Sequence, residues 1–261
     1  MRRLLILVIL SLLLLPVGSG YAARTFDGTD DSLQTASTLT LGSATKLAVS
    51  FWLWWDGFAN DFDMALETGA SWNEDGGGWV VSPNYSDAAS PFMFGAGNDL
   101  AYITRPSTGA WHHYVVNFDV GITTNHVVSA YLDGSSATLT NYTTSAATQT
   151  FGNKTLNFMS RANSSLFGAG RMADVAIWTG IALSGTDVTD LNNGTLPTSV
   201  QSGSLVYYWK ICGNDSPETA TTGGLNATVN GTTQSSHPSA VSSSCGGASA
   251  APRGLLLGVY P

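Results

Sequence analysis

The sequence predicts an all-β fold, a two-sheet antiparallel β-sandwich with one short helix. Gly, Ser, Thr and Asn recur about every ten residues, and the short segments between them are rich in Val, Ile, Phe, Tyr and Trp. Turn residues at this spacing, between β-branched and aromatic runs, are typical of a sandwich. The length of 261 residues suits a single all-β domain behind a leader, and we find no internal repeat or interdomain linker.

The N-terminal segment has the pattern of a signal peptide. Arg2 and Arg3 supply positive charge, residues 4–15 are almost entirely apolar, and small residues precede an expected cleavage site after Ala22. The apolar run is too short to span a bilayer comfortably. We expect a secreted or cell-surface protein with no membrane span after cleavage. The chain would then have three parts: a signal peptide at 1–22, a sandwich domain at 23–246 and an apolar C-terminal tail at 247–261.

The clearest strand covers Lys46–Trp55, in which apolar and other residues alternate. One face must belong to the core. It consists of Leu47, Val49, Phe51, Leu53 and Trp55. The other face carries Ser50, Trp52 and Trp54. Two indoles on this second face mean that it is either covered or a ligand surface.

Other segments are also expected to be strands. They are Trp111–Asp119, Val127–Asp133, Arg171–Trp178 and Leu205–Ile211, the last of these being the last major strand. Asp133-Gly134 is a strong hairpin signal, so we expect Ala137–Tyr142 to pair back on the strand before it.

One helix is expected after Ser184. Asp187 follows three residues later and completes a capping box, although Glu would close it better. Val188 and Leu191 supply a short apolar face, and Asn193-Gly194 ends the helix.

The two cysteines are Cys212 and Cys245. In an exported protein such a pair is expected to form a disulfide, which would close a loop of about 33 residues and stabilise by roughly 3–4 kcal/mol. The tail beyond it contains Leu255-Leu256-Leu257. This tail either packs loosely or adds an edge strand to its own domain or to a partner.

The charge of the chain excludes one class of partner. Its formal net charge is −8 at pH 7, and its Lys and Arg are scattered rather than gathered in a stripe. Nucleic acid is therefore not an expected partner. The many Asp suit a soluble surface and permit binding of divalent cations.

Several motifs occur in one order along the chain. They are Phe26-Asp27-Gly28 with Asp30-Asp31, Phe51-Trp52, Trp111-His112-His113, Tyr131-Leu132-Asp133-Gly134, and residues 170–178 running into Ala182-Leu183-Ser184. In this order they resemble the laminin-G-like domains, which are concanavalin A-like jelly rolls. The resemblance covers residues 25–241 and implies a sandwich with a single short helix after a long strand. It implies no function, because this fold hosts lectins, glycanases, adhesion modules and spacers.

Catalysis is not expected. Retaining glycosidases need two carboxyl groups about 5 Å apart, and the glucanases of this fold place them on one strand as Glu-x-Asp-x-x-Glu. The chain has only three Glu, none at that spacing, and its nearest pair is Asp63 with Glu67. The adjacent His112 and His113 point to opposite faces of a strand, and the spacing shows neither a Gly-x-Ser-x-Gly elbow nor a Ser–His–Asp set.

If the chain binds an ion, calcium is the expected one, as a structural cofactor. The resemblance implies it, because many related sandwiches carry a structural calcium and their first and last segments often lie close together. The candidate ligands are oxygen atoms of Asp27, Asp30, Asp31, Asn214 and Asp215. The alternative is a simple turn at Asp27-Gly28 with solvated carboxylates.

A glycan platform needs an aromatic face with amides and carboxylates near it. The first candidate is a Gly-rich loop that contains Trp72, Asn73, Glu74, Asp75 and Trp79. The alternative is that Trp72 folds back and covers the mouth of the sandwich. The second candidate is the face of Ser50, Trp52 and Trp54, but the resemblance implies that Trp52 belongs to the core.

The sequence thus predicts a secreted, non-catalytic recognition module whose ligand is a glycan. The alternative is a structural or adhesion module that assembles with a surface protein through its tail or a sheet edge. A glycan hydrolase is the third and weakest interpretation.

Overall fold

The computed structural model describes residues 21–57, 59, 62–73, 76–84, 91–143, 147–213, 215–238 and 240. Most of the expected signal peptide, the whole expected tail and Cys245 lie outside these ranges. The signal peptide, the tail and the disulfide between Cys212 and Cys245 therefore stay predictions. No helix in the described ranges has the length and hydrophobicity that crossing a bilayer requires.

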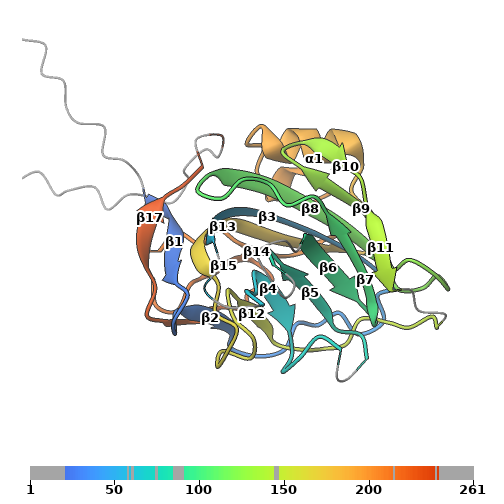
Figure 1. The fold of residues 1–261 in the computed structure, drawn as a ribbon, viewed down its shortest axis with the longest axis horizontal. Helices are drawn as coiled ribbons and strands as arrows, with labels where there is room; N and C mark the ends of the chain where they lie inside the picture. Colours follow the sequence, from blue (N-terminus) through green and yellow to red (C-terminus); the bar gives the residue numbers. More distant parts are fainter. Residues whose placement is uncertain are drawn as a thin grey trace, which may run out of the picture.

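Two antiparallel sheets stack face to face (Figure 1). The nine-stranded sheet has the order β10 (Ser135–Ala137), β9 (Val127–Leu132), β8 (Trp111–Asp119), β3 (Lys46–Gly57), β13 (Ala169–Thr179), β1 (Tyr21–Asp27) and β17 (Thr233–Ser236), with β14 (Leu205–Trp209) on β13 and β15 (Ala220–Thr222) on β14. The eight-stranded sheet has the order β11 (Thr140–Thr143), β7 (Asp99–Ile103), β6 (Phe92–Ala96), β5 (Trp79–Ser82), β4 (Leu66–Thr68), β12 (Leu156–Phe158), β2 (Ser32–Thr35) and β16 (Ala227–Asn230). The predicted two-sheet sandwich is confirmed.

The main core fills the space between the sheets. The five residues of β3 that were expected to face it are Leu47, Val49, Phe51, Leu53 and Trp55, and each is at most 5% exposed. From the other sheet, Trp79 and Phe94 point into the same core. Burial of alternate residues is what a strand with one core face requires, so the alternation identified this face correctly.

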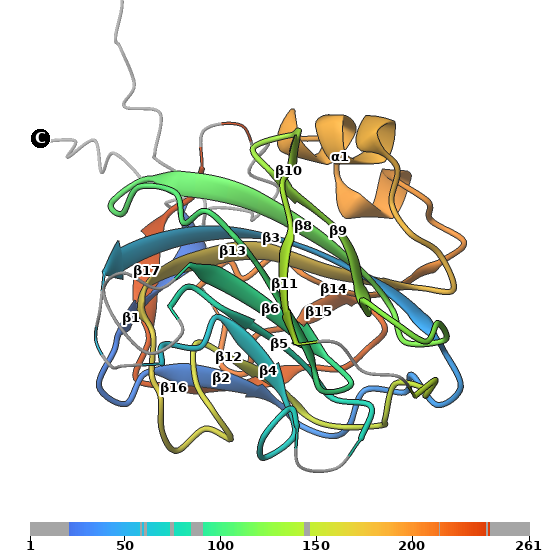
Figure 2. The same cartoon turned by 45° about the vertical axis from the view of Figure 1, so that its right-hand side comes forward.

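The helix α1 (Gly185–Asn192) lies over the outer face of the nine-stranded sheet (Figure 2). A second apolar cluster fills the space beneath it. The predicted capping box is present: the N–H of Asp187 donates to Oγ of Ser184 at 3.3 Å, and the N–H of Ser184 donates to Oδ2 of Asp187 at 2.8 Å. Val188 and Leu191 are buried against the sheet. A 3₁₀ helix, Pro197–Ser199, follows.

The predicted hairpin at Asp133-Gly134 is confirmed, because both residues have positive φ, 50° and 80°. The prediction of a single return strand over Ala137–Tyr142 is wrong. The range contains two strands: β10 pairs with β9, whereas β11 pairs with β7 of the other sheet. Leu139 between them packs on the main core, so the chain turns inward there and crosses from one sheet to the other.

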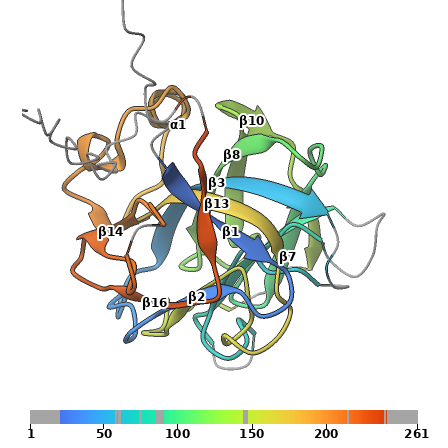
Figure 3. The same ribbon diagram turned by 90° about the vertical axis from the view of Figure 1, so that its left-hand side faces the viewer.

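The polar C-terminal stretch completes both sheets. The predicted strand Leu205–Ile211 contains β14, and three short strands follow it. β16 joins β2, and β17 lies beside β1 (Figure 3). A buried ion pair adds to this closure: Nε of Arg24 donates to Oε2 of Glu218 at 2.8 Å, and Oε1 of Glu218 accepts from the N–H of Cys212. The first and last described segments are therefore held together.

Candidate functional site

The outward side chains of β3 change from covered to open along the strand. Ala48 lies in the cluster under α1, and Ser50 and Trp52 are 2% and 7% exposed. Trp54 is half-buried and Asp56 is exposed. The sequence left this face as either covered or a ligand surface. The structure shows that its first half is covered and its second half is open.

The open half forms a surface that we call the tryptophan patch, made of Trp54, Trp111 and Arg171. Trp54 pairs with Trp111 of β8 and with Arg171 of β13, so the three stand in one row across neighbouring strands. All three side chains are half-buried. The two indoles meet edge to face with ring centroids 6.2 Å apart. The guanidinium carbon of Arg171 lies 4.5 Å from the centroid of the Trp54 ring.

A carboxylate, that of Asp56, lies beside the patch. Nε1 of Trp54 donates to Oδ1 of Asp56 at 2.7 Å, which fixes the orientation of the indole. Aromatic side chains beside charged and hydrogen-bonding groups are the elements that carbohydrate recognition uses. This row is the arrangement in the described structure that best fits a ligand surface.

A small cavity lies between the patch and α1. Among the residues that line it are Ser50, Trp52, His113 and Asp174, with residues 194–197 above them. Oγ of Ser50 lies 2.9 Å from Nε2 of His113, and the His113 ring stacks at a tilt against Trp52 with centroids 5.0 Å apart. Asp174 accepts at Oδ1 a hydrogen bond from the hydroxyl of Tyr208. The space open to the centre of a water molecule is about 10 Å³, which is room for about one water.

Burial shifts the protonation of both ionisable groups of this cavity. It lowers the pKa of His113 to about 4, so the imidazole is neutral at pH 7. It raises the pKa of Asp174 to about 6, against the opposing effect of the hydrogen bond from Tyr208. Nδ1 of His113 has no hydrogen-bond partner among the described residues.

The Ser50–His113 pair was missed at the sequence level. The two positions are far apart in sequence, and only the register of β3 on β8, with Trp52 opposite His113, makes them diagonal neighbours on the outer face. The arrangement does not support nucleophilic catalysis. Ser50 is 2% exposed, and the cavity holds about one water rather than a substrate.

The loop platform is largely buried. Trp79 is 0% exposed and faces the main core, and Trp72 is 8% exposed. Trp72 lies on the outer face of the eight-stranded sheet over Gly95, where an added Cβ would come within 3.2 Å of its ring. Asn73 is exposed and accepts a hydrogen bond from Ser71 at 2.7 Å. Glu74 and Asp75 lie outside the described residues.

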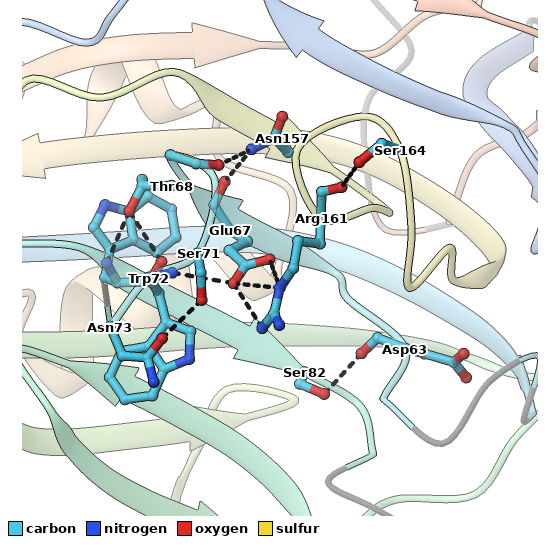
Figure 4. A network of polar contacts seen from close by, with 12 residues as sticks. Asp63, Glu67, Thr68, Ser71, Trp72, Asn73, Ser82, Asn157, Arg161 and Ser164 are labelled. Atoms are coloured by element: carbon cyan, nitrogen blue, oxygen red, sulfur yellow. Dashed lines mark hydrogen bonds and ion pairs between the residues drawn. The ribbon is translucent and has the colours of Figure 1, made fainter. Parts of the chain in front are cut away.

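A polar network holds Trp72 in place (Figure 4). The backbone N–H of Trp72 donates to Oε1 of Glu67 at 3.2 Å, and Nε of Arg161 donates to both Glu67 carboxylate oxygens at 3.1 and 3.0 Å. The Glu67 side chain is 0% exposed and that of Arg161 is 30% exposed. The neighbouring carboxylate of Asp63 is also fully buried and accepts from Nε1 of Trp55 at 3.2 Å. Glu67 and Asp63 are therefore structural groups within the sheet rather than a solvent-facing acid pair.

The acidic turn gathers part of the expected calcium ligands. Carboxylate oxygens of Asp27, Asp30 and Asp31 lie within 4.8 Å of one another. Asp215 is not part of this group, and its carbonyl accepts from Nη2 of Arg24. Asn214 lies outside the described residues.

Hydrogen bonds within the turn organise these carboxylates. Oδ1 of Asp27 accepts from the N–H of Thr29 at 2.7 Å, which lowers the pKa of Asp27. Burial raises the pKa of Asp31, and the charges of Asp27 and Asp30 raise it further. Three clustered carboxylates are a donor set that suits calcium, so the residues fit the expected ion. Calcium at this turn stays a prediction.

Known structures share the fold at low identity. A proposed carbohydrate-binding protein from Bacteroides ovatus superposes with a TM-score of 0.62 at 14% identity, over 85% of this chain and 62% of that one. The chain thus spans less than two thirds of that protein. A heptameric SAP-like pentraxin from Limulus polyphemus gives a TM-score of 0.50 at 15% identity, over 67% of this chain and 83% of that one. No curated protein matches the chain in sequence.

A family model matches most of the sandwich. It describes the concanavalin A-like lectin/glucanases superfamily, in its laminin-G form, and it matches residues 27–189, which is more than half of the chain. The match begins at the acidic turn and ends within α1, so it includes all of the ordered motifs that carry the resemblance except Phe26. The two stacked antiparallel sheets agree with it. The chain belongs to the concanavalin A-like lectin/glucanase superfamily.

Proposed function

We propose that the chain is a secreted, non-catalytic carbohydrate-binding module whose binding surface is the tryptophan patch. One observation carries this proposal: Trp54 and Trp111 are half-buried side chains that point outward from adjacent strands in one row. The apolar face of a pyranose stacks on an indole, and a row of two indoles offers places for consecutive sugar rings.

The environment of the acids supports the non-catalytic part. Both Glu side chains within the described ranges are buried and paired with arginine, Glu67 with Arg161 and Glu218 with Arg24. A glycosidase needs one carboxyl group that can protonate the glycosidic oxygen and a second one on the other side of the bond. Paired, buried glutamates cannot approach a sugar without breaking the sheet network. The shared fold of the Bacteroides ovatus protein, itself proposed to bind carbohydrate, supports this role.

The test is a glycan array probed with the full-length chain recovered after secretion, followed by calorimetric titration of each bound glycan. Trp54→Ala and Trp111→Ala should each weaken binding roughly tenfold or more, since one stacking contact is lost. Tyr142→Ala is the matched control, because Tyr142 is 63% exposed on β11 of the other sheet. This variant should bind as the unchanged protein does.

Thermal unfolding of each variant separates lost binding from lost folding, and Trp54→Phe supplies a milder second change. Glycan binding that survives both Trp variants would overturn the assignment of the patch. An array with no bound glycan would favour the alternative, a structural module that assembles with a surface protein.

A further inference from the structure

Arg171 differs from the other arginines that the structure describes. Arg24 and Arg161 are paired with buried glutamates, and Nε of Arg105 donates to the carbonyl of Pro83 at 2.8 Å. Within the described part of the chain, the guanidinium of Arg171 has no hydrogen bond or ion pair. It makes a cation–π contact with the ring of Trp54. A half-buried cation without a counter-ion remains available to a ligand.

The position of Arg171 determines which hydrogen bonds it can donate to a ligand. A guanidinium that lies on an aromatic ring keeps its N–H groups in the plane of the fork, where they can donate to two oxygens at once. On the side away from Trp54, Arg171 pairs with Thr25 of β1, which pairs in turn with Thr233 of β17. The row across the sheet therefore continues from two indoles to a cation and then to two hydroxyl-bearing residues.

We propose that Arg171 makes the tryptophan patch selective for acidic glycans, in which a carboxylate or a sulfate ester binds the guanidinium while the sugar ring stacks on an indole of the patch. This inference rests on the proposed function of the patch. Bidentate hydrogen bonds to an anionic group are the strongest contacts that an arginine makes. In a chain of net charge −8, attraction of an acidic ligand requires a local cation.

Asp56 limits where the anionic group can lie. Its carboxylate lies beside the patch, fixed by the hydrogen bond from Nε1 of Trp54, and it repels a second anion. The acidic substituent therefore binds on the side of Trp54 where Arg171 and Thr25 stand. The selectivity is local and concerns one substituent, so it does not require a polyanion.

The experiment compares matched pairs of probes by calorimetric titration. One pair is an oligogalacturonate and its methyl ester, and the other is a sulfated galactan oligosaccharide and its desulfated form. The unchanged protein should bind the charged member of at least one pair roughly tenfold more tightly, the value of one hydrogen-bonded charge contact. The pair that shows the difference distinguishes a carboxylate from a sulfate.

The variants assign the difference to Arg171. Arg171→Gln should reduce it to less than about threefold, because the loss of affinity falls mainly on the charged member, whose charge contact is removed. Arg171→Lys keeps the charge and loses the fork, so it should be intermediate. Lys46→Gln is the control, since Lys46 is a 49% exposed cation at the far end of β3. This control should keep the full difference.

The outcomes separate this inference from the proposed function. Neutral and charged probes that bind equally, with both lost in Trp54→Ala, would overturn the acidic selectivity and retain the sugar-binding patch. Equal loss of both probes in Arg171→Gln, at an unchanged melting temperature, would also overturn it, because the arginine would then only support Trp54. Absence of binding by every probe, while the glycan array shows another bound glycan, overturns the acidic selectivity alone, and absence of binding by the probes and by the array overturns both proposals.

Discussion

His113 and Asp174 line the same small cavity, and burial shifts their pKa values in opposite directions over one pH interval. The pKa of His113 is lowered to about 4, and that of Asp174 is raised to about 6. The two residues come from different strands, β8 and β13. They meet because a bulge in β13 between Ala173 and Ala176 gives Asp174 a positive φ of 48°.

The first prediction concerns stability against pH. As pH falls from 6.5 to 4, the unfolded chain protonates His113 before the folded chain does, which destabilises the fold by about 3 kcal/mol. Over almost the same interval the folded chain protonates Asp174 first, which stabilises the fold by about 3 kcal/mol. The two contributions nearly cancel in the unchanged protein.

Single variants should reveal each contribution. Asp174→Asn should lose stability more steeply on acidification to pH 4 than the unchanged protein, and His113→Gln should lose it less steeply, each by about 2–3 kcal/mol in denaturant titrations. Asp190→Asn changes an exposed carboxylate on α1 and serves as the control. Parallel pH profiles for all four proteins would contradict the opposed shifts.

Trp72→Ala should damage stability rather than binding. The indole is 8% exposed and packs over Gly95, so its removal leaves a cavity that costs about 3–5 kcal/mol. Chemical denaturation measures this loss, and titration with a bound glycan at a temperature where the variant is folded should give an unchanged affinity. A stable variant that no longer binds glycan would restore the loop as the platform and remove the tryptophan patch.

The ion pair of Glu67 and Arg161 predicts an asymmetric double-mutant cycle. Arg161→Met leaves a fully buried carboxylate without its cation, which should cost about 3–5 kcal/mol. Glu67→Gln leaves an arginine that is 30% exposed and can reach water, so it should cost less. The double variant should be more stable than Arg161→Met alone. Equal and additive losses in urea titrations would show that the two side chains do not depend on each other.

The acidic turn predicts a response to calcium. An ion bound by Asp27, Asp30 and Asp31 only in the folded state, at a hundred times its Kd, adds about 2.7 kcal/mol and raises the melting temperature by roughly 5–10 °C. Chelator should reverse the shift, and Asp31→Asn should abolish it. Asp56→Asn is the control, since Asp56 lies outside the turn. A melting temperature that changes with neither calcium nor chelator would show that the turn is a simple hydrogen-bonded loop.

Sequence patterns predicted those parts of the fold that depend on residues close together in the chain. Alternation placed the core face of β3, and Ser184 with Asp187 placed the start of α1, because both depend on residues close in sequence. The pairing of Ser50 with His113 could not be predicted, since it depends on the register of β3 on β8. The burial of Trp72 was one of two alternatives, and it was decided by Gly95 on another strand, which leaves room for the ring.

Asp56 should oppose the acidic selectivity that Arg171 provides. Asp56→Asn keeps an oxygen that can accept from Nε1 of Trp54, so the indole stays in place while one negative charge leaves the patch. Affinity for the acidic probe should rise about two- to threefold at low ionic strength, since removal of an exposed charge contributes less than about 1 kcal/mol. The gain should shrink in 1 M salt, where the screening length falls to about 3 Å. Affinity for the neutral probe should not change in either condition, because stacking on the indole involves no charge. Titrations of both probes at low and high salt measure all four values, and a gain that is equal for both probes would mean that Asp56 acts on the indole rather than on the anion.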